Sequence, residues 1–126
     1  MSNSDDRPPM WIGHVSISVP DVKASKDFFI ALGMRDIGPF DDFAILEMRA
    51  GTHLIIQRAS DPVEHGTAVP FDLMVDDIEA THAHLASAGL EPGKIDSNRV
   101  HHYFVIEEPG GHNVLFNSSH NTGLPV

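Results

Sequence analysis

Histidine is the residue type in this sequence best suited to chemistry. The 126 residues include nine histidines and no cysteine. Imidazole is the commonest metal ligand in proteins and the side chain most readily protonated near neutral pH. The absence of cysteine excludes thiolate metal sites, cysteine nucleophiles and disulfides. Any reactive centre in this chain must therefore combine imidazoles with carboxylates, hydroxyls and amides.

The polar side chains that could share such a centre follow a strand-like alternation. In residues 14–19 the polar positions alternate with Val15, Ile17 and Val19, a period of two that predicts a strand with one apolar face. The same alternation in later segments predicts a common polar surface. Its members are His14, Ser16, Ser18, His53, Gln57, Asp72, His101, Tyr103, Asn113 and Asn117. Because buried polar groups need hydrogen-bond partners, we expect this surface to line a concavity that holds water or a ligand.

Three of these residues are candidates for catalysis, namely His14, Asp72 and His101. His14 either contacts a ligand or bonds a neighbouring carbonyl as a structural residue. Asp72 interrupts an apolar strand, where it could pair with a histidine, accept a hydrogen bond from a ligand or face water. His101 and His102 are adjacent, so in a strand only one of them can enter the site. His53 follows a turn and is either a ligand contact or simply exposed.

The remaining histidines have weaker functional interpretations. His112 belongs to a hairpin turn and is expected to be solvated, while His120 follows the last strand at the rim of the concavity. His82 and His84 are two residues apart on a predicted helix, where side chains diverge. The sequence contains neither a phosphate-binding glycine loop nor a Gly-x-Ser-x-Gly nucleophile motif.

The elements that must position these residues occur in the order βαβββ, twice. In the first half Asp21 is a predicted N-cap and Gly33 a predicted helix stop; the elements are a strand at 14–19, a helix at 22–32 and strands near 36–37, 43–48 and 53–57. In the second half Asp76-Asp77 offers the N-cap; the elements are a strand at 69–75, a helix at 78–88 and strands near 94–95, 101–106 and 113–117.

The two halves resemble each other where each first strand meets its helix. Residues 14–22 and 70–78 both end in valine, a breaker, aspartate and an aliphatic residue. This repetition predicts duplicated modules at about 11–58 and 69–117 within one α+β domain that spans 11–117. Residues 1–10 are expected to form a disordered arm, and residues 118–126 an irregular tail.

These motifs resemble the vicinal oxygen chelate superfamily, which contains glyoxalase, bleomycin-resistance and extradiol dioxygenase proteins. The resemblance rests on the run His-Val-Ser-Ile-Ser-Val-Pro-Asp-Val at 14–22, on Phe28-Phe29 and Leu32-Gly33-Met34, and on the Glu-Pro-Gly-Gly-His-Asn-Val hairpin at 108–114. It covers about residues 11–117. It implies two βαβββ modules that form a curled mixed sheet around a cavity, and chains that pair as homodimers.

The resemblance also implies four metal-ligand positions, one on each of four strands. They fall on His14, Ile55, Pro70 and Leu115, and the last three cannot coordinate a metal. The usual site is therefore expected to be absent. A displaced site with a divalent metal (Fe, Zn, Ni or Mn) could use His14, His53 and Asp72, or His14, Asp72 and His101.

Net charge and hydropathy narrow the classes of partner that this chain could bind. The net charge of −10 disfavours nucleic acid and anionic membranes, and no segment has the roughly 18 apolar residues of a membrane span. The N-terminus has no export signal, so a cytoplasmic location is expected.

The preferred hypothesis for function is a protein that binds or sequesters a small molecule, and the negative charge would suit a cationic one. One alternative is a metal-dependent lyase, isomerase or dioxygenase with a rearranged His/Asp site. Another is a metal-free enzyme in which Asp72 orients His14 or His101 as general base.

Overall fold

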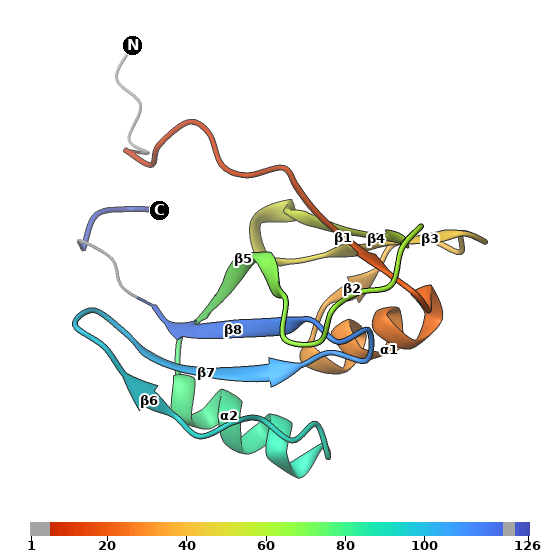
Figure 1. The fold of residues 1–126 in the computed structure, drawn as a ribbon. Helices are drawn as coiled ribbons and strands as arrows, with labels where there is room; N and C mark the ends of the chain where they lie inside the picture. Colours follow the sequence, from red (N-terminus) through yellow and green to blue (C-terminus); the bar gives the residue numbers. More distant parts are fainter. Residues whose placement is uncertain (1–5, 120–122) are drawn as a thin grey trace.

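The computed structural model describes residues 6–119 and 123–126, so the expectations for residues 1–5 and His120 lie outside the described residues. The βαβββ order is confirmed twice (Figure 1). The first module contains β1 (His14–Val19), α1 (Val22–Leu32), β2 (Arg35–Asp36), β3 (Phe43–Glu47) and β4 (His53–Arg58), with a short 3-10 turn at Arg49–Gly51. The second contains β5 (Ala68–Val75), α2 (Ile78–Ser87), β6 (Asp96–Ser97), β7 (His102–Glu107) and β8 (Asn113–Ser118).

Both helices begin where the sequence predicts. Asp21 Oδ1 accepts a hydrogen bond from the Ala24 N–H at 3.1 Å, and Asp77 Oδ1 accepts one from the Ala80 N–H at 2.9 Å. These bonds satisfy backbone donors that a helix N-terminus leaves unpaired. Gly33, with φ of 118°, ends α1 in the left-handed conformation.

The short strands differ most from the sequence-based expectation. The strands expected near 36–37 and 94–95 are β2 and β6, at Arg35–Asp36 and Asp96–Ser97. Each has two residues, and its position is set by pairing with the long strand beside it rather than by its own pattern. β7 begins at His102, so His101 precedes the strand in which it was expected.

The strands form two mixed sheets with the orders β1–β4–β3–β2 and β5–β8–β7–β6. In each module the first strand runs parallel to the last, and the other pairs are antiparallel. β1 and β5 lie beside each other, so the sheets curl around a common middle without closing. This is the expected α+β architecture of two modules.

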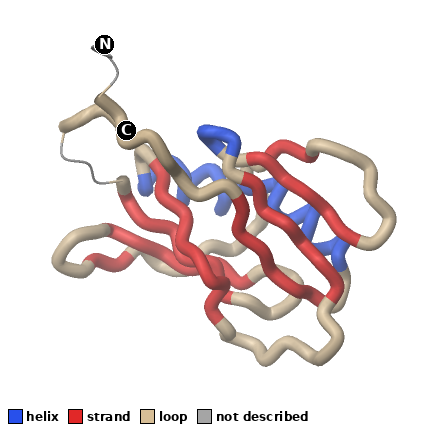
Figure 2. The backbone as a smooth tube through the Cα atoms, turned by 90° about the horizontal axis from the view of Figure 1, so that it is seen from above, coloured by secondary structure: helices blue, strands red, loops and turns tan. Residues whose placement is uncertain are grey.

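Each helix covers one face of the sheet of its own module (Figures 1 and 2). The apolar positions of the strands point to these helices and form the core, in which the rings of Phe104 and Phe116 stack with centroids 4.8 Å apart. We call the opposite side of the two sheets the helix-free face. It carries the alternate, less buried positions of each strand.

The two modules also correspond in their last hairpins. Residues 48–52 connect β3 to β4, and residues 108–112 connect β7 to β8. In both turns the first residue pairs with the fifth, through the N–H of Met48 to the Thr52 carbonyl and of Glu108 to the His112 carbonyl, each at 2.8 Å. Met48 is therefore the structural equivalent of Glu108.

Candidate functional site

The helix-free face of the first sheet holds half of the ten predicted polar residues. His14, Ser16 and Ser18 on β1 are in register with His53, Ile55 and Gln57 on β4. In a parallel pair, residues in register point to the same side of the sheet. Gln57 Nε2 donates to Ser18 Oγ at 3.2 Å. Strands β1 and β4 thus present hydrogen-bonding groups beside the aliphatic Ile55 on one face of the sheet.

An imidazole and carboxylate cluster lies at the start of β1. The rings of His14 and His53 have centroids 5.6 Å apart, and His53 Nε2 lies 3.1 Å from Glu47 Oε2. Arg35 Nε donates to the other Glu47 oxygen at 3.0 Å. Hydrogen bonds from Arg35 and then from His53 lower the pKa of Glu47 below its ordinary value. Glu47 is therefore an ionised partner for His53.

Sequence reasoning missed Glu47, although a signal was present. Phe43, Ile45 and Glu47 alternate along β3, which puts Glu47 on the helix-free face. Only the antiparallel register with β4 sets Glu47 opposite His53. Next to this cluster is a shallow pocket of about 390 Å³, lined by Met10, Trp11, Gly13, His14, Gly51 and His53.

The helix-free face of the second sheet carries a different pair. Asn117 on β8 is buried, and its Nδ2 donates to Asp72 Oδ2 on β5. Asp72 is exposed, so its carboxylate remains accessible to a ligand. Tyr103 on β7 is in register with Asn117. The partner of Asp72 is an amide rather than the histidine that the sequence had suggested as one option.

His101 has a structural contact. Its Nδ1 lies 2.8 Å from the Ser118 carbonyl, which accepts the ring N–H, and the side chain is half-buried before β7. His102 is exposed and its Nδ1 lies 2.7 Å from Ser97 Oγ. Since Asp72 is bonded to Asn117, the structure does not pair Asp72 with His101.

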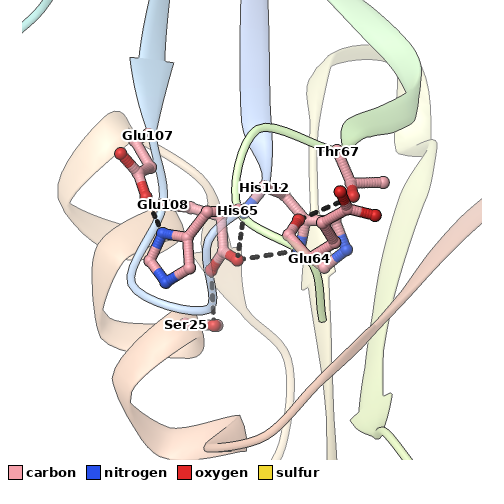
Figure 3. Close-up of polar contacts among 7 residues, drawn as sticks. All are labelled: Ser25, Glu64, His65, Thr67, Glu107, Glu108 and His112. Atoms are coloured by element: carbon pink, nitrogen blue, oxygen red, sulfur yellow. Dashed lines mark hydrogen bonds and ion pairs between the residues drawn. The ribbon is translucent and has the colours of Figure 1, made fainter. Parts of the chain in front are cut away.

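The expectation that His112 is solvated is wrong. Its side chain is buried, with Nδ1 2.8 Å from Glu108 Oε1 (Figure 3). Ser25 of α1 donates from Oγ to the other Glu108 oxygen at 2.6 Å, so the cluster joins the first module to the turn of the second. The sequence-based expectation treated the turn in isolation, whereas in the folded chain α1 packs against it.

Glu108 is a buried carboxylate with several donors. Burial by itself raises its pKa, but hydrogen bonds from Ser25, the Gly110 N–H and His112 outweigh burial and lower the pKa of Glu108 below 4.5. Gly110 is required there, because a Cβ at this position would lie 2.5 Å from Glu108 Oε1. The cluster is closed to solvent and stabilises the contact between modules.

The family's four ligand positions do not fit a metal in this chain. Ile55 and Leu115 are in register with Ser16 and Asp72 in the middle of each helix-free face, and neither they nor Pro70 can donate an electron pair. Across residues 6–119 and 123–126, no three histidine, aspartate or glutamate side chains gather in a group that could hold a metal. The sets His14, His53 and Asp72, and His14, Asp72 and His101, are thus not assembled in this structure.

A comparison with protein-family models gives the same family as the fold, the repeat and the hairpin motif. The model of the Glyoxalase/Bleomycin resistance protein/Dioxygenase superfamily matches residues 11–116. The chain belongs to this superfamily. Within the described residues no helix is long and apolar enough to cross a membrane. No curated protein sequence matches this member of the superfamily.

Solved structures share its fold at low sequence identity. A lactoylglutathione lyase from Agrobacterium tumefaciens is 14% identical with a TM-score of 0.72, covering 90% of this chain and 96% of its own. TnmS3, an antibiotic-binding protein from Streptomyces sp. CB03234, is 16% identical with a TM-score of 0.75, covering 88% and 97%. The oxidase ChaP-H1 is 19% identical with a TM-score of 0.69, covering 90% and 99%.

Proposed function

We propose that this superfamily member binds a small organic molecule on the helix-free face and does not hold it through the family's metal site. The observation that carries the proposal is the composition of that face. Aliphatic side chains occupy three of the four family ligand positions, at Ile55, Pro70 and Leu115. Hydrogen-bonding groups stand next to them, among them Ser16 and Asp72.

The chemistry of this face favours an amphipathic ligand with a donor or cationic group. Ile55 and Leu115 supply apolar contact, and Asp72 supplies a carboxylate that Asn117 orients from below the surface. The net charge of −10 raises the local concentration of cations at all exposed positions. An antibiotic-binding neighbour with the same fold, TnmS3, is consistent with a binding role.

The proposal includes pairing as a homodimer in the cytoplasm. Large apolar side chains are exposed on the helix-free face, with Phe43 at 38% and Met74 at 52% exposure. Covering them in a dimer would bury apolar surface and enclose the ligand.

A ligand screen with a matched pair of variants tests the binding role. Thermal shift with a panel of cationic glycopeptide, quinone and glutathione-conjugate compounds should identify a binder. Asp72→Asn should weaken binding of a cationic hit about tenfold, while Asp61→Asn, which removes an exposed loop carboxylate, should not. Equal affinity of the two variants would exclude Asp72 as a ligand contact.

The His53–Glu47 pair supports a second candidate, an enzyme that works by acid–base catalysis. Glu47, ionised beside Arg35, accepts from His53 Nε2–H and would stabilise the imidazolium formed when His53 removes a proton from a substrate. Turnover of a screened ligand should then fall strongly in Glu47→Gln, with the acid limb of the pH–rate profile displaced. Unchanged turnover in this variant would remove the candidate.

The metal-dependent lyase, isomerase or dioxygenase remains a separate alternative. Elemental analysis of protein purified without a His-tag or chelator, alongside His14→Ala, tests it directly. About one equivalent of Fe, Zn, Ni or Mn per chain, lost in the variant, would make a rearranged metal centre the better explanation and overturn the binding proposal.

A further inference from the structure

The two modules meet at two equivalent seams. In the first seam the turn 108–112 of the second module packs against α1, and Glu108 bonds Ser25 there. In the second seam the turn 48–52 of the first module lies near the start of α2, where the two terminal guanidinium nitrogens of Arg49 donate to the Asp76 carboxylate. The element order of the modules and the matching hydrogen bond of the two turns make these seams a matched pair.

The second seam contains a cavity of about 490 Å³. This volume lies within the range of about 300–1,000 Å³ for small-molecule sites. Most of the wall is apolar, and four polar residues complete it. The lining residues are Leu32, Gly33, Met34, Met48, Leu73, Met74, Val75, Ala80 and Phe116, with Arg49, Asp76, Asp77 and Thr81.

The first seam shows what polar group fits this place. Ser25 is four residues after the N-cap Asp21, and Thr81 is four residues after the N-cap Asp77. Ser25 Oγ donates to a carboxylate oxygen at 2.6 Å. Thr81, at the equivalent position, is half-buried and lines the cavity, and no residue in the described part of the chain forms a side-chain hydrogen bond with its hydroxyl. The second seam thus keeps the donor and lacks the acceptor.

The chain cannot supply that acceptor from its own turn. Met48 stands where the first seam has Glu108, so the turn 48–52 itself carries no carboxylate. Ala50 stands where the first seam has Gly110, and a Cβ at Gly110 would lie 2.5 Å from the Glu108 oxygen. Ala50 also has φ of 62°, whereas Gly110 has no positive φ, so the two turns differ in backbone at this residue.

Three charged side chains line the cavity, and each of the two carboxylates already has a hydrogen-bond partner. Asp76 is paired with Arg49, and the Asp77 carboxylate accepts from the Ala80 N–H as the cap of α2. Arg49 is exposed at the rim, where its guanidinium can approach a bound anion.

We propose that the second seam is a binding site for a small apolar carboxylate, whose carboxylate takes the place that Glu108 occupies in the first seam. The hydrocarbon part packs on Met34, Leu73 and Phe116, and the carboxylate accepts from Thr81 Oγ. The site differs from the one on the helix-free face, and it does not depend on the function proposed there.

Octanoate is the probe for this site, with octylamine and 1-octanol as matched controls of opposite or no charge. In protein labelled with ¹³C-methyl methionine, titration with octanoate should shift the methyl signals of Met34 and Met48, which line the cavity. The signal of Met10, which is 78% exposed and lies elsewhere, is the internal control. Shifts at Met10 alone, or no shifts with millimolar octanoate, would overturn the site.

Two variants test the assignment of the carboxylate. Thr81→Val keeps the shape of the side chain, removes the hydroxyl and should weaken octanoate binding about tenfold. The double variant Met48→Glu/Ala50→Gly recreates the turn of the first seam, and its own carboxylate should abolish binding, whereas Ala50→Gly alone should retain it. Circular dichroism establishes whether the double variant folds, and Thr81→Val decides the question if it does not.

Octanoate binding by variants of the two sites distinguishes this proposal from the one made for the helix-free face. Asp72→Asn should bind octanoate with wild-type affinity. Octylamine binding as tightly as octanoate at the same methionines, or an unchanged octanoate affinity in Thr81→Val, would contradict the carboxylate assignment.

Discussion

The two seams between the modules are closed by the same turn hydrogen bond and have opposite interiors. In the first, Ser25, Glu108 and His112 are all buried and all hydrogen-bonded to one another through the carboxylate. In the second, the equivalents of Ser25 and Glu108 are Thr81 and Met48, which line a cavity. The duplication of the module therefore sets where the two modules contact each other. A few side chains at each contact then determine whether it is a filled, hydrogen-bonded core or an open cavity.

The difference between the two seams arises because a buried charge must be hydrogen-bonded. A carboxylate removed from water is tolerated only when several donors replace its hydration. The turn 108–112 supplies such donors, and Gly110 leaves space for the oxygen they surround. The turn 48–52 has the Met48 thioether in place of the carboxylate. A thioether is apolar and flexible, so it requires no hydrogen-bond donors and packs less specifically.

Removing Glu108 should have the largest effect on stability. Glu108→Ala leaves the Ser25 hydroxyl and the His112 ring buried without their acceptor, and should lower the free energy of unfolding by about 3 kcal/mol. Urea denaturation followed by circular dichroism measures it. Glu107→Ala, which removes an exposed carboxylate paired with the exposed His65, should cost about 0.5 kcal/mol or less. Similar losses in both variants would show that the first seam is not the dominant contact.

Acid should weaken the first seam selectively. The pKa of Glu108 is lower in the folded chain than its ordinary 4.5, because hydrogen bonds from Ser25, Gly110 and His112 outweigh burial. The folded chain then binds fewer protons than the unfolded chain. Its stabilisation is full above about pH 4.5 and is lost as the pH falls through the folded pKa. Glu108→Gln should flatten this acid limb of stability against pH, and an unaltered limb in that variant would refute the assignment.

The equivalent hydroxyls should differ in their contribution. Ser25→Ala removes a buried donor to a charged acceptor and should cost about 1.5–3 kcal/mol. Thr81→Ala removes a half-buried hydroxyl that has no side-chain acceptor among the described residues, and should cost clearly less. Thermal and urea unfolding of the two variants give the comparison. Equal losses would indicate that Thr81 has a structural bond like that of Ser25.

The smallest expected change is a gain in stability at the second seam. Ala50 has φ of 62°, a left-handed conformation that costs a non-glycine residue about 1–2 kcal/mol. Ala50→Gly should therefore raise the free energy of unfolding by about 0.5–1 kcal/mol after the extra entropy of glycine is subtracted. A loss of stability in the unfolding curve would mean that the Ala50 methyl group makes a contact that outweighs the strain.

Much of the fold was predictable because its signals are local. The alternation in residues 14–19 and the caps at Asp21 and Asp77 act within a few residues, and the structure places both helices within one residue of the sequence-based bounds. The two-residue strands were misplaced because they exist only through pairing with β3 and β7. The repeat and the hairpin motif together led to the superfamily that the family model matches.

The contacts of the candidate site were less accessible to sequence reasoning. The shared face of His14, Ser16 and Ser18 follows from strand periodicity, but the pairing of His53 with Glu47 depends on register between strands. His112 looks solvated in its turn, and α1, which begins 90 residues earlier, buries its carboxylate partner. Asp72 could have bonded several groups, and the parallel pairing of β5 with β8 selected Asn117.

By itself, the sequence determined the order of elements, the helix ends, the duplicated modules and the aliphatic side chains of Ile55, Pro70 and Leu115, where the resemblance places three metal ligands of the family. Periodicity, capping and side-chain chemistry are properties of short segments, so they can be recognised without knowledge of the tertiary structure. The tertiary structure alone decided which seam is filled and which is open, and which carboxylate meets which imidazole. Those outcomes depend on distances between residues far apart in the chain, and only packing of the two modules sets them.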